Sequence, residues 1–282
     1  MKEKISNQQL RKIAKEIRAT IFKMAYCAGG SHLAPSFSVV ELLTVLYGRF
    51  INNDPRDPEA EDRDRFILSK GHASAAIFAV LAQFGFIDRN QLKTYCQPGS
   101  ILGGHPEMDM VPGIEVSTGS LGHGLAQGGG MALAAKLDQK PYRVFAILGD
   151  GECQEGSVWE AAEFIAHHQL TNLTAIVDYN KLQALDRIEN IMGLEPMADK
   201  WRAFGWEVRE VDGHDIDALV ETFEQLPFST KKPSMVIAHT IKGKGLSFME
   251  SIPIWHFRMP NEEEMKLVYK ELDIKAGELT EI

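Results

Sequence analysis

The stretch VFAILGDGECQEG, residues 144–156, decides the fold of this 282-residue chain. Its apolar beginning, residues 144–148, has the length and composition of a strand that is buried on both faces. Gly-Asp-Gly at 149–151 ends that strand, and its two glycines permit a sharp turn that a ligand can approach closely. A second apolar run, residues 173–177, ends at Asp-Tyr-Asn, residues 178–180. In an open parallel sheet both ends lie at the carboxyl edge, where ligands bind.

Asp150 and Asn180 are candidate ligands of a divalent cation at that edge. A carboxylate and an amide oxygen suit a hard cation that keeps diphosphate oxygens as its other ligands. A backbone carbonyl just past Asn180 is a candidate third ligand, and Leu182 is the best placed. The alternative is that Asp150 caps the following helix and Asn180 forms an Asx-turn. A lone Gly-Asp-Gly is a weak signal, but the matching strand end at Asn180 strengthens it.

The composition is that of an ordinary soluble globular protein, with 44% hydrophobic and 24% charged residues. The net charge of -9 argues against general binding of nucleic acids or of anionic membranes. The N-terminus lacks an apolar signal core, and no apolar run is long enough to span a membrane. Cys27, Cys96 and Cys153 form no metal-ligand pair, so we expect free thiols in a reducing compartment, the cytoplasm.

Predicted helices alternate with predicted strands along the chain, which indicates a parallel sheet with helices on both faces. Because no repeat and no linker interrupts the pattern, we expect one α/β domain over residues 1–282. The glycine- and proline-rich segment 97–119 is a long loop, and such loops are commonly functional. Helices are predicted at about 1–28, 36–50, 73–83, 121–137, 158–168, 216–226 and, as a tail helix, 261–272; strands are predicted at 65–69, 144–148, 173–177, 206–211 and 234–239.

Five of the nine histidines lie where glycine-rich irregular segments begin or end. A single histidine of this kind is more often structural, but several beside strand ends favour a polar pocket. Neutral imidazoles in such a pocket would bind hydroxyls and carbonyls, and charged ones would bind phosphate. Two more histidines lie in the predicted helix 158–168 and are interpreted as structural, and His214 and His239 have no predicted role. The five pocket candidates are His32, His72, His105, His123 and His256.

Two further glycine-containing segments are candidates for phosphate binding. Ser-Thr-Gly-Ser-Leu-Gly at 117–122 opens a predicted helix, and Gly119 and Gly122 would let a flat ring or a diphosphate approach the backbone. The alternative there is an ordinary helix start with Ser/Thr capping. Lys-Gly-Lys-Gly at 242–245 fits a mobile basic lid or, equally well, a solvated turn.

Taken together, these residues resemble the N-terminal, diphosphate-binding half of a transketolase. The matching motifs stand in the family's order and cover residues from about 29 to 183: GGSHLAPS, RFILSKGHA, LGGHPE, GIEVSTGSLGHGL, GDGECQEG and DYNKLQ. KGKG and IPIWH extend the match to about residue 256. Several independent motifs in one order are a specific signal. The resemblance implies a single three-layer α/β domain with a mainly parallel sheet, the thiamine-diphosphate-binding fold of the diphosphate-binding type.

The resemblance also implies thiamine diphosphate and a divalent ion, usually Mg²⁺, for which Ca²⁺ or Mn²⁺ can substitute. By position, Asp150, Asn180 and the carbonyl of Leu182 resemble the metal ligands. His32, His105 and His256 resemble the catalytic histidines of the substrate pocket. Glu155 resembles a carboxylate that reaches across to the partner's cofactor-activating region. The implied cofactor-binding residues are His72, Gly119, Ser120, Leu121, Gly149, Asp150, Gly151, Glu152, Asn180 and His256.

The implied reaction transfers a two-carbon ketol unit from a ketose phosphate to an aldose phosphate. It could serve the pentose phosphate pathway or a specialised branched-sugar route. The family's pyrimidine-binding domain and C-terminal domain have no counterpart in this sequence. We therefore expect a split enzyme that is active only with a separate C-terminal subunit carrying the pyrimidine-binding domain, in an α2β2 assembly.

Three other functions are compatible with parts of the pattern. The N-terminal part of a 1-deoxyxylulose-5-phosphate synthase shares the cofactor and the fold, but residues 152–156 fit transketolase better. A non-catalytic thiamine-diphosphate-binding subunit would differ in its cofactor titration with and without partner chains. An unrelated Rossmann-type nucleotide binder is disfavoured because no GxGxxG follows the first strand.

Overall fold

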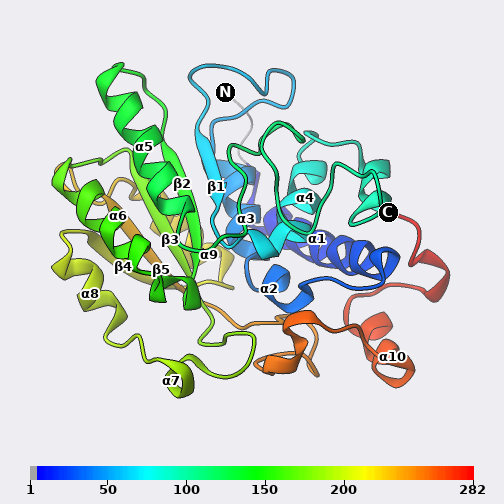
Figure 1. Cartoon of the computed structure of the whole chain (residues 1–282). Helices are drawn as coiled ribbons and strands as arrows, with labels where there is room; N and C mark the ends of the chain where they lie inside the picture. Colours follow the sequence, from blue (N-terminus) through cyan, green and yellow to red (C-terminus); the bar gives the residue numbers. More distant parts are fainter. Residues whose placement is uncertain (1–4) are drawn as a thin grey trace.

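The structure, a computed structural model, describes residues 5–282. Five strands within this range form one sheet in the order β1-β2-β3-β5-β4. Each neighbouring pair is parallel, so the carboxyl ends of the strands share one edge of the sheet (Figure 1). The strands are β1 (Arg65–Leu68), β2 (Val144–Gly149), β3 (Leu173–Tyr179), β4 (Glu207–Asp212) and β5 (Ser234–His239).

Helices cover both faces of the sheet and give a single three-layer domain, as predicted (Figure 1). Phe145 and Ile147 enter an apolar cluster with α1, α3, α4 and α9, whereas Ala146 and Leu148 enter a second cluster with α5, α6 and α8. This alternation follows from the two-residue period of a strand. The helices are α1 (Asn7–Ala28), α2 (Leu33–Ser38), α3 (Val40–Val45), α4 (Ser74–Gln83), α5 (Gly124–Leu137), α6 (Gly156–His167), α7 (Ile188–Ile191), α8 (Met197–Ala203), α9 (Ile216–Glu224) and α10 (Glu262–Glu271).

The predicted helix at 36–50 is wrong in its extent. The helical segment begins earlier, at Leu33, because Pro35 lies in the first turn of α2, where a missing N–H costs little. It is interrupted at Val39, whose backbone (φ -100, ψ 4) leaves the helical region between α2 and α3. The last five residues, Leu46–Phe50, form a π-helical turn. The short helices α7 and α8 were not predicted.

Two helix ends that were predicted from the sequence are formed by the expected capping residues. Gly29 ends α1 in the left-handed region (φ 72), which a glycine adopts without strain. Asn261 and Glu264 form a capping box at the start of α10, close to the predicted tail helix. The three cysteines are free thiols. None of the helices in the described part of the chain has the length and apolarity needed to cross a bilayer.

Candidate functional site

A cavity of about 350 Å³ opens at the carboxyl edge of the sheet. Its size lies in the range of small-molecule sites. It collects side chains and turns from the ends of β1, β2, β3 and β5, which are neighbours in the sheet. The lining residues are Pro35, Lys70, His72, Gly119, Leu121, Gly149, Asp150, Gly151, Glu152, Gln154, Glu155, Asn180, Leu182, Gln183, Ala184, Lys242 and His256.

Asp150 and Asn180 meet in this cavity because the strands that carry them are adjacent. Gly149 of β2 pairs in register with Asp178 of β3. The Asp150 carboxylate is buried and accepts hydrogen bonds from the N–H groups of Gly151 and Lys181. Burial, reinforced by the charge of Asp178, raises the pKa of Asp150 to about 7. The two N–H donors do not offset the cost of burying the negative charge of Asp150. A bound cation would offset it and favour the ionised carboxylate.

The carbonyl of Leu182 already lies against a cationic group. Lys242 Nζ donates to the carbonyl oxygens of Leu182 (3.2 Å) and Gln183 (3.0 Å). Lys242 is buried, so the prediction of a solvated turn is wrong for this residue. Burial and then the charge of Lys70 lower the pKa of Lys242 to about 8.

The donors around Asp150 fit a divalent cation by their chemistry. They are one carboxylate, one amide and one backbone carbonyl, all oxygen donors of the kind that Mg²⁺ and Ca²⁺ bind. Among residues 5–282 no group of three or more His, Cys, Asp or Glu side chains could hold a metal ion. The predicted set needs only one such side chain, and its remaining ligands would come from the diphosphate.

A buried ion pair that sequence reasoning missed supports the site. Lys70 Nζ donates to the fully buried carboxylate of Asp178 at 2.5 Å. Asp178 also accepts from Ser38 Oγ at 2.7 Å, from Thr240 Oγ1 and from Asn180 Nδ2 at 3.1 Å. The last contact fixes which end of the Asn180 amide is its oxygen. Two features of the sequence could have indicated this ion pair: Lys70 lies in SKGH at a predicted strand end, and Asp178 lies two residues before Asn180.

Glu152 lines the cavity, but its carboxylate holds the surrounding turns together. It accepts from Ser69 Oγ, from the N–H of Gly122 (2.9 Å) and from the N–H of Gly149 (3.0 Å). Burial raises the pKa of Glu152. Its role in the free protein is therefore to join the ends of β1 and β2 to the turn before α5.

The segment 117–122 brings Gly119 and Leu121 to the cavity, whereas Gly122, the other glycine predicted to approach a ligand, is not among the lining residues. Gly119 has a φ of 136, and a Cβ there would lie 2.7 Å from Cδ2 of His105. Glycine is required because the imidazole of His105 packs against its backbone. Ser120 is exposed and is not among the lining residues.

Four of the five predicted pocket histidines form one cluster beside the cavity. The ring of His32 lies 5.5 Å from His72, 6.0 Å from His105 and 5.2 Å from His256, between centroids. His72 and His256 are 5.4 Å apart and line the cavity directly. His123 is exposed outside this cluster, with Nδ1 3.1 Å from the carbonyl oxygen of Leu121.

Three of the four clustered imidazoles are held neutral. Burial, followed by the charge of His105, lowers the pKa of His32 to about 4. Burial, followed by Lys242, lowers the pKa of His256 to about 3. Burial and Lys70 place the pKa of His72 well below its usual value. Neutral rings both donate and accept, which suits sugar hydroxyls and carbonyls. The buried Nδ1 of His256 has no hydrogen-bond partner in the described structure and is free to take one from a ligand.

His32 and His256 should stay neutral in solution down to about pH 4. The unfolded chain binds these protons near the ordinary histidine pKa of about 6.5, so the folded state should lose stability as the pH falls from there towards 4. NMR titration of the carbon-bound protons of the two imidazole rings measures their pKa values. The signals are assigned with the variants His32→Gln and His256→Gln. A titration midpoint above about 6 for either ring, near the unperturbed value, would contradict it.

Comparison with known proteins identifies the class. Residues 9–277 match the family of the transketolase, thiamine diphosphate binding domain. A transketolase from Campylobacter jejuni superposes on 99% of this chain and 44% of its own, with a TM-score of 0.90 and 29% identity. The chain therefore belongs to the transketolase family, and its fold is that of the family's thiamine-diphosphate-binding domain.

Several relatives are of similar length to this chain. An apulose-4-phosphate transketolase subunit from Phocaeicola vulgatus is 42% identical over 262 residues, 93% of both chains. A 6-deoxy-6-sulfo-D-fructose transketolase subunit from a Clostridium species is 43% identical over 245 residues, 87% of this chain and 89% of its own. Human transketolase is 35% identical over 273 residues, 95% of this chain but only 43% of its own length.

Proposed function

We propose that this chain is the N-terminal subunit of a two-subunit transketolase. The complex transfers a two-carbon ketol unit from a ketose phosphate to an aldose phosphate. The observation that carries the proposal is the meeting of Asp150, Asn180 and the Leu182 carbonyl in one cavity, beside a cluster of histidines. The names of its relatives favour this function over a 1-deoxyxylulose-5-phosphate synthase.

Asp150, Asn180 and the carbonyl of Leu182 would hold Mg²⁺, with Ca²⁺ or Mn²⁺ as substitutes. The ammonium groups of Lys70 and Lys242, which line the same cavity, supply positive charge for a diphosphate. Gly119 and Leu121 give the flat rings a close-packed wall. When bound, thiamine diphosphate supplies the carbon nucleophile and the electron sink for cleavage of a carbon–carbon bond.

The neutral histidines supply hydrogen bonds to the sugar. His256, with its unpartnered Nδ1, is placed to donate to or accept from a substrate oxygen. His32 contacts the rings of His72, His105 and His256 and so lies in the middle of the cluster. The neutral imidazoles of His32 and His256 could exchange protons with hydroxyl and carbonyl oxygens without first having to lose a charge. We assign His32, His105 and His256 to the substrate and His72 to the cofactor.

The mouth of the cavity supports a partner subunit. Leu185, next to the lining residue Ala184, is 88% exposed. Phe257, next to His256, is 61% exposed, and Ile254 is 63% exposed. Exposed apolar side chains gathered near a site mark an interaction surface. The partner is a C-terminal subunit with the pyrimidine-binding domain, Glu155 reaches towards it, and the assembly is α2β2. The Phocaeicola vulgatus relative is itself named as one subunit of a transketolase, which points the same way.

The substrate class follows from the relatives and stays part of the proposal. One relative is named for apulose 4-phosphate and one for 6-deoxy-6-sulfo-D-fructose. These names favour a specialised sugar route over the pentose phosphate pathway. Three free thiols fit the reducing cytoplasm as the place of action.

The chain alone should show no ketol transfer, and addition of its C-terminal subunit with thiamine diphosphate and Mg²⁺ should restore it. The reason is that the second polypeptide would cover the cofactor and the exposed apolar side chains Leu185, Ile254 and Phe257 beside the cavity. A coupled assay with a panel of ketose and aldose phosphates, including apulose 4-phosphate, measures this. One control is the C-terminal subunit assayed alone. The other is an assay for consumption of pyruvate, which tests for 1-deoxyxylulose-5-phosphate synthase activity. Full turnover by the isolated chain would refute the two-subunit proposal.

A further inference from the structure

The loop after β5 carries Lys242 into the cavity, and a histidine outside the site holds its backbone. The N–H of Ile241, the residue before Lys242, donates to Nε2 of His214 at 2.8 Å. The other ring nitrogen of His214, Nδ1, lies 2.9 Å from Oε2 of Glu41. Because Nε2 accepts a hydrogen bond, Nδ1 carries the proton and donates it to Glu41.

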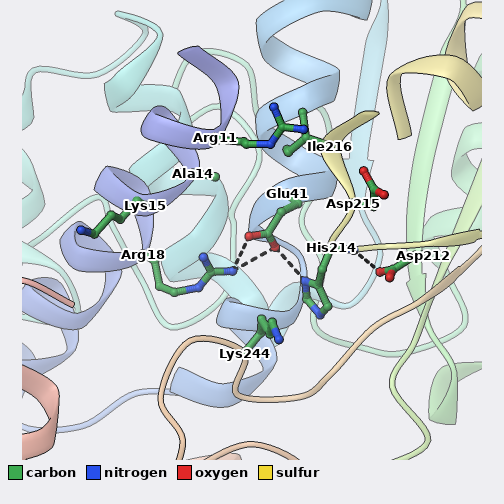
Figure 2. Close-up of a pocket in the computed structure, with 10 residues that line it drawn as sticks. All are labelled: Arg11, Ala14, Lys15, Arg18, Glu41, Asp212, His214, Asp215, Ile216 and Lys244. Carbon is green, nitrogen blue, oxygen red and sulfur yellow. Dashed lines mark hydrogen bonds and ion pairs between the residues drawn. The ribbon is translucent and has the colours of Figure 1, made fainter. Parts of the chain in front are cut away.

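Glu41 is held in turn by Arg18. Arg18 Nη2 lies 2.7 Å and 2.9 Å from the two oxygens of the Glu41 carboxylate. Figure 2 shows the three side chains joined in a row, with the His214 backbone N–H bonded to Asp212. Arg18 comes from α1, Glu41 from α3 and His214 from the turn between β4 and α9. The row therefore connects three separate elements to the Lys242 loop.

The row of Arg18, Glu41 and His214 orients the imidazole and adds little to the stability of the fold. Arg18 and Glu41 are each 8% exposed, and the desolvation of such an ion pair offsets most of its Coulomb attraction. Burial acts to raise the pKa of Glu41, but Arg18 and His214 outweigh it and hold the pKa below its usual value. Glu41 therefore stays ionised and fixes the orientation and tautomer of the imidazole.

The same row touches the loop a second time, beyond Lys242. Gly245 has a φ of 99, and a Cβ there would lie 2.5 Å from Cδ of Arg18. Only glycine lets the Arg18 side chain pack directly against this backbone. The row thus contacts the loop at Ile241 and at Gly245, on both sides of Lys242.

We propose that His214 is a positioning residue: supported by Glu41 and Arg18, it fixes the backbone of Ile241 and thereby holds the ammonium of Lys242 in the cofactor cavity. This inference rests on the proposed function in one respect, namely that Lys242 faces the diphosphate. Other contacts also hold the loop, among them those from Ser251 N–H to the carbonyl oxygen of Lys242 (2.9 Å) and from Gly243 N–H to that of Ala34 (3.1 Å). Loss of the His214 contact should loosen the loop rather than release it.

A matched pair of variants isolates the contact with Ile241. In His214→Asn the amide can still donate to Glu41, but the side chain is too short to reach Ile241. In His214→Gln the longer side chain can place an oxygen where Nε2 accepts. In the assembled complex with saturating Mg²⁺, His214→Asn should raise the dissociation constant for thiamine diphosphate about 10-fold, the effect of one lost hydrogen bond. His214→Gln should stay within about 3-fold of the original protein.

A double-mutant cycle separates positioning from general structural support. If His214 acts through Lys242, His214→Asn should change the affinity less than about 2-fold in a Lys242→Met background. Equal effects of His214→Asn in both backgrounds would overturn the proposal. Glu41→Gln, which keeps an oxygen for His214 but loses the charge that pairs with Arg18, provides a second variant if His214→Asn does not fold. It should give a smaller loss of affinity that also disappears in the Lys242→Met background.

Amide hydrogen exchange tests the network without the cofactor. In the free chain, His214→Asn should speed exchange of the Ile241 amide about 10-fold, and His214→Gln should not, because only the former loses the acceptor. Unchanged exchange in His214→Asn would refute the inference. Failure of the unmodified complex to bind thiamine diphosphate would instead refute the proposed function, and the exchange result would still decide the role of His214.

Discussion

Asp150→Asn should weaken binding of thiamine diphosphate with Mg²⁺ by at least about 100-fold in the assembled complex and reduce ketol transfer accordingly. The substitution preserves shape but removes the single carboxylate among the predicted metal ligands. Loss of one partner of a buried charge pair typically costs about 3–5 kcal/mol, which exceeds the 1.4 kcal/mol of a tenfold change in affinity. Calorimetric titration of the cofactor at fixed Mg²⁺ measures the effect directly.

Asp199→Asn is the matched control for this experiment. Asp199 is an exposed carboxylate of α8 that pairs only with the neighbouring Arg202, and it lies outside the cavity. Its replacement should leave the affinity unchanged. Undiminished cofactor binding by Asp150→Asn would show that the metal, if one binds, is held elsewhere, and the proposed site would have to be abandoned.

Lys70→Met should lower the free energy of unfolding of the isolated chain by about 3–5 kcal/mol, because it leaves the Asp178 carboxylate buried without its counter-charge. Burial acts to raise the pKa of Asp178, and Lys70 is the first of the groups that hold it below normal. Without Lys70 the carboxyl group should bind a proton more readily, and the loss should be smaller at low pH. Urea unfolding at two pH values measures both effects.

Two further variants make the Lys70 result interpretable. Lys70→Met with Asp178→Asn should recover part of the loss, since it removes the unpaired charge as well. Lys140→Met breaks an exposed pair with Glu61 and should cost far less than the loss of a buried pair. A cost for Lys70→Met no larger than that of Lys140→Met would show that the buried pair is not a determinant of stability.

The strands could be read from the sequence because they are buried on both faces. Residues 144–148 are a continuous apolar run, residues 173–177 are apolar except for Thr174, and the structure places both in the interior of the sheet. The helix predicted at 36–50 was wrong because its apolar residues are buried all round, so periodicity gave no sign of the break at Val39. α7 spans four residues, too few to establish any period.

The sequence predicted those parts of the site that lie at or beside the ends of strands. Asp150 and Asn180 line the cavity together, as adjacent strands required, and four of five histidines cluster beside it. Lys70 was missed, and the burial of Lys242 was not predicted, because no local pattern separates a buried lysine from a solvated one. Their burial depends on partners 108 and 60 residues away, Asp178 and Leu182.

The order of the strands also bears on how the protein acquires its site during folding. Because β5 inserts between β3 and β4, the turn that carries Lys242 reaches the ends of β2 and β3 only after the chain has returned to the middle of the sheet. Non-local pairing of this kind slows folding, since loop closure must precede the contacts that reward it. Until β5 has paired with β3, a nascent chain has the turns that carry Asp150 and Asn180 but lacks Lys242 and His256, so the complete vitamin site forms late in folding.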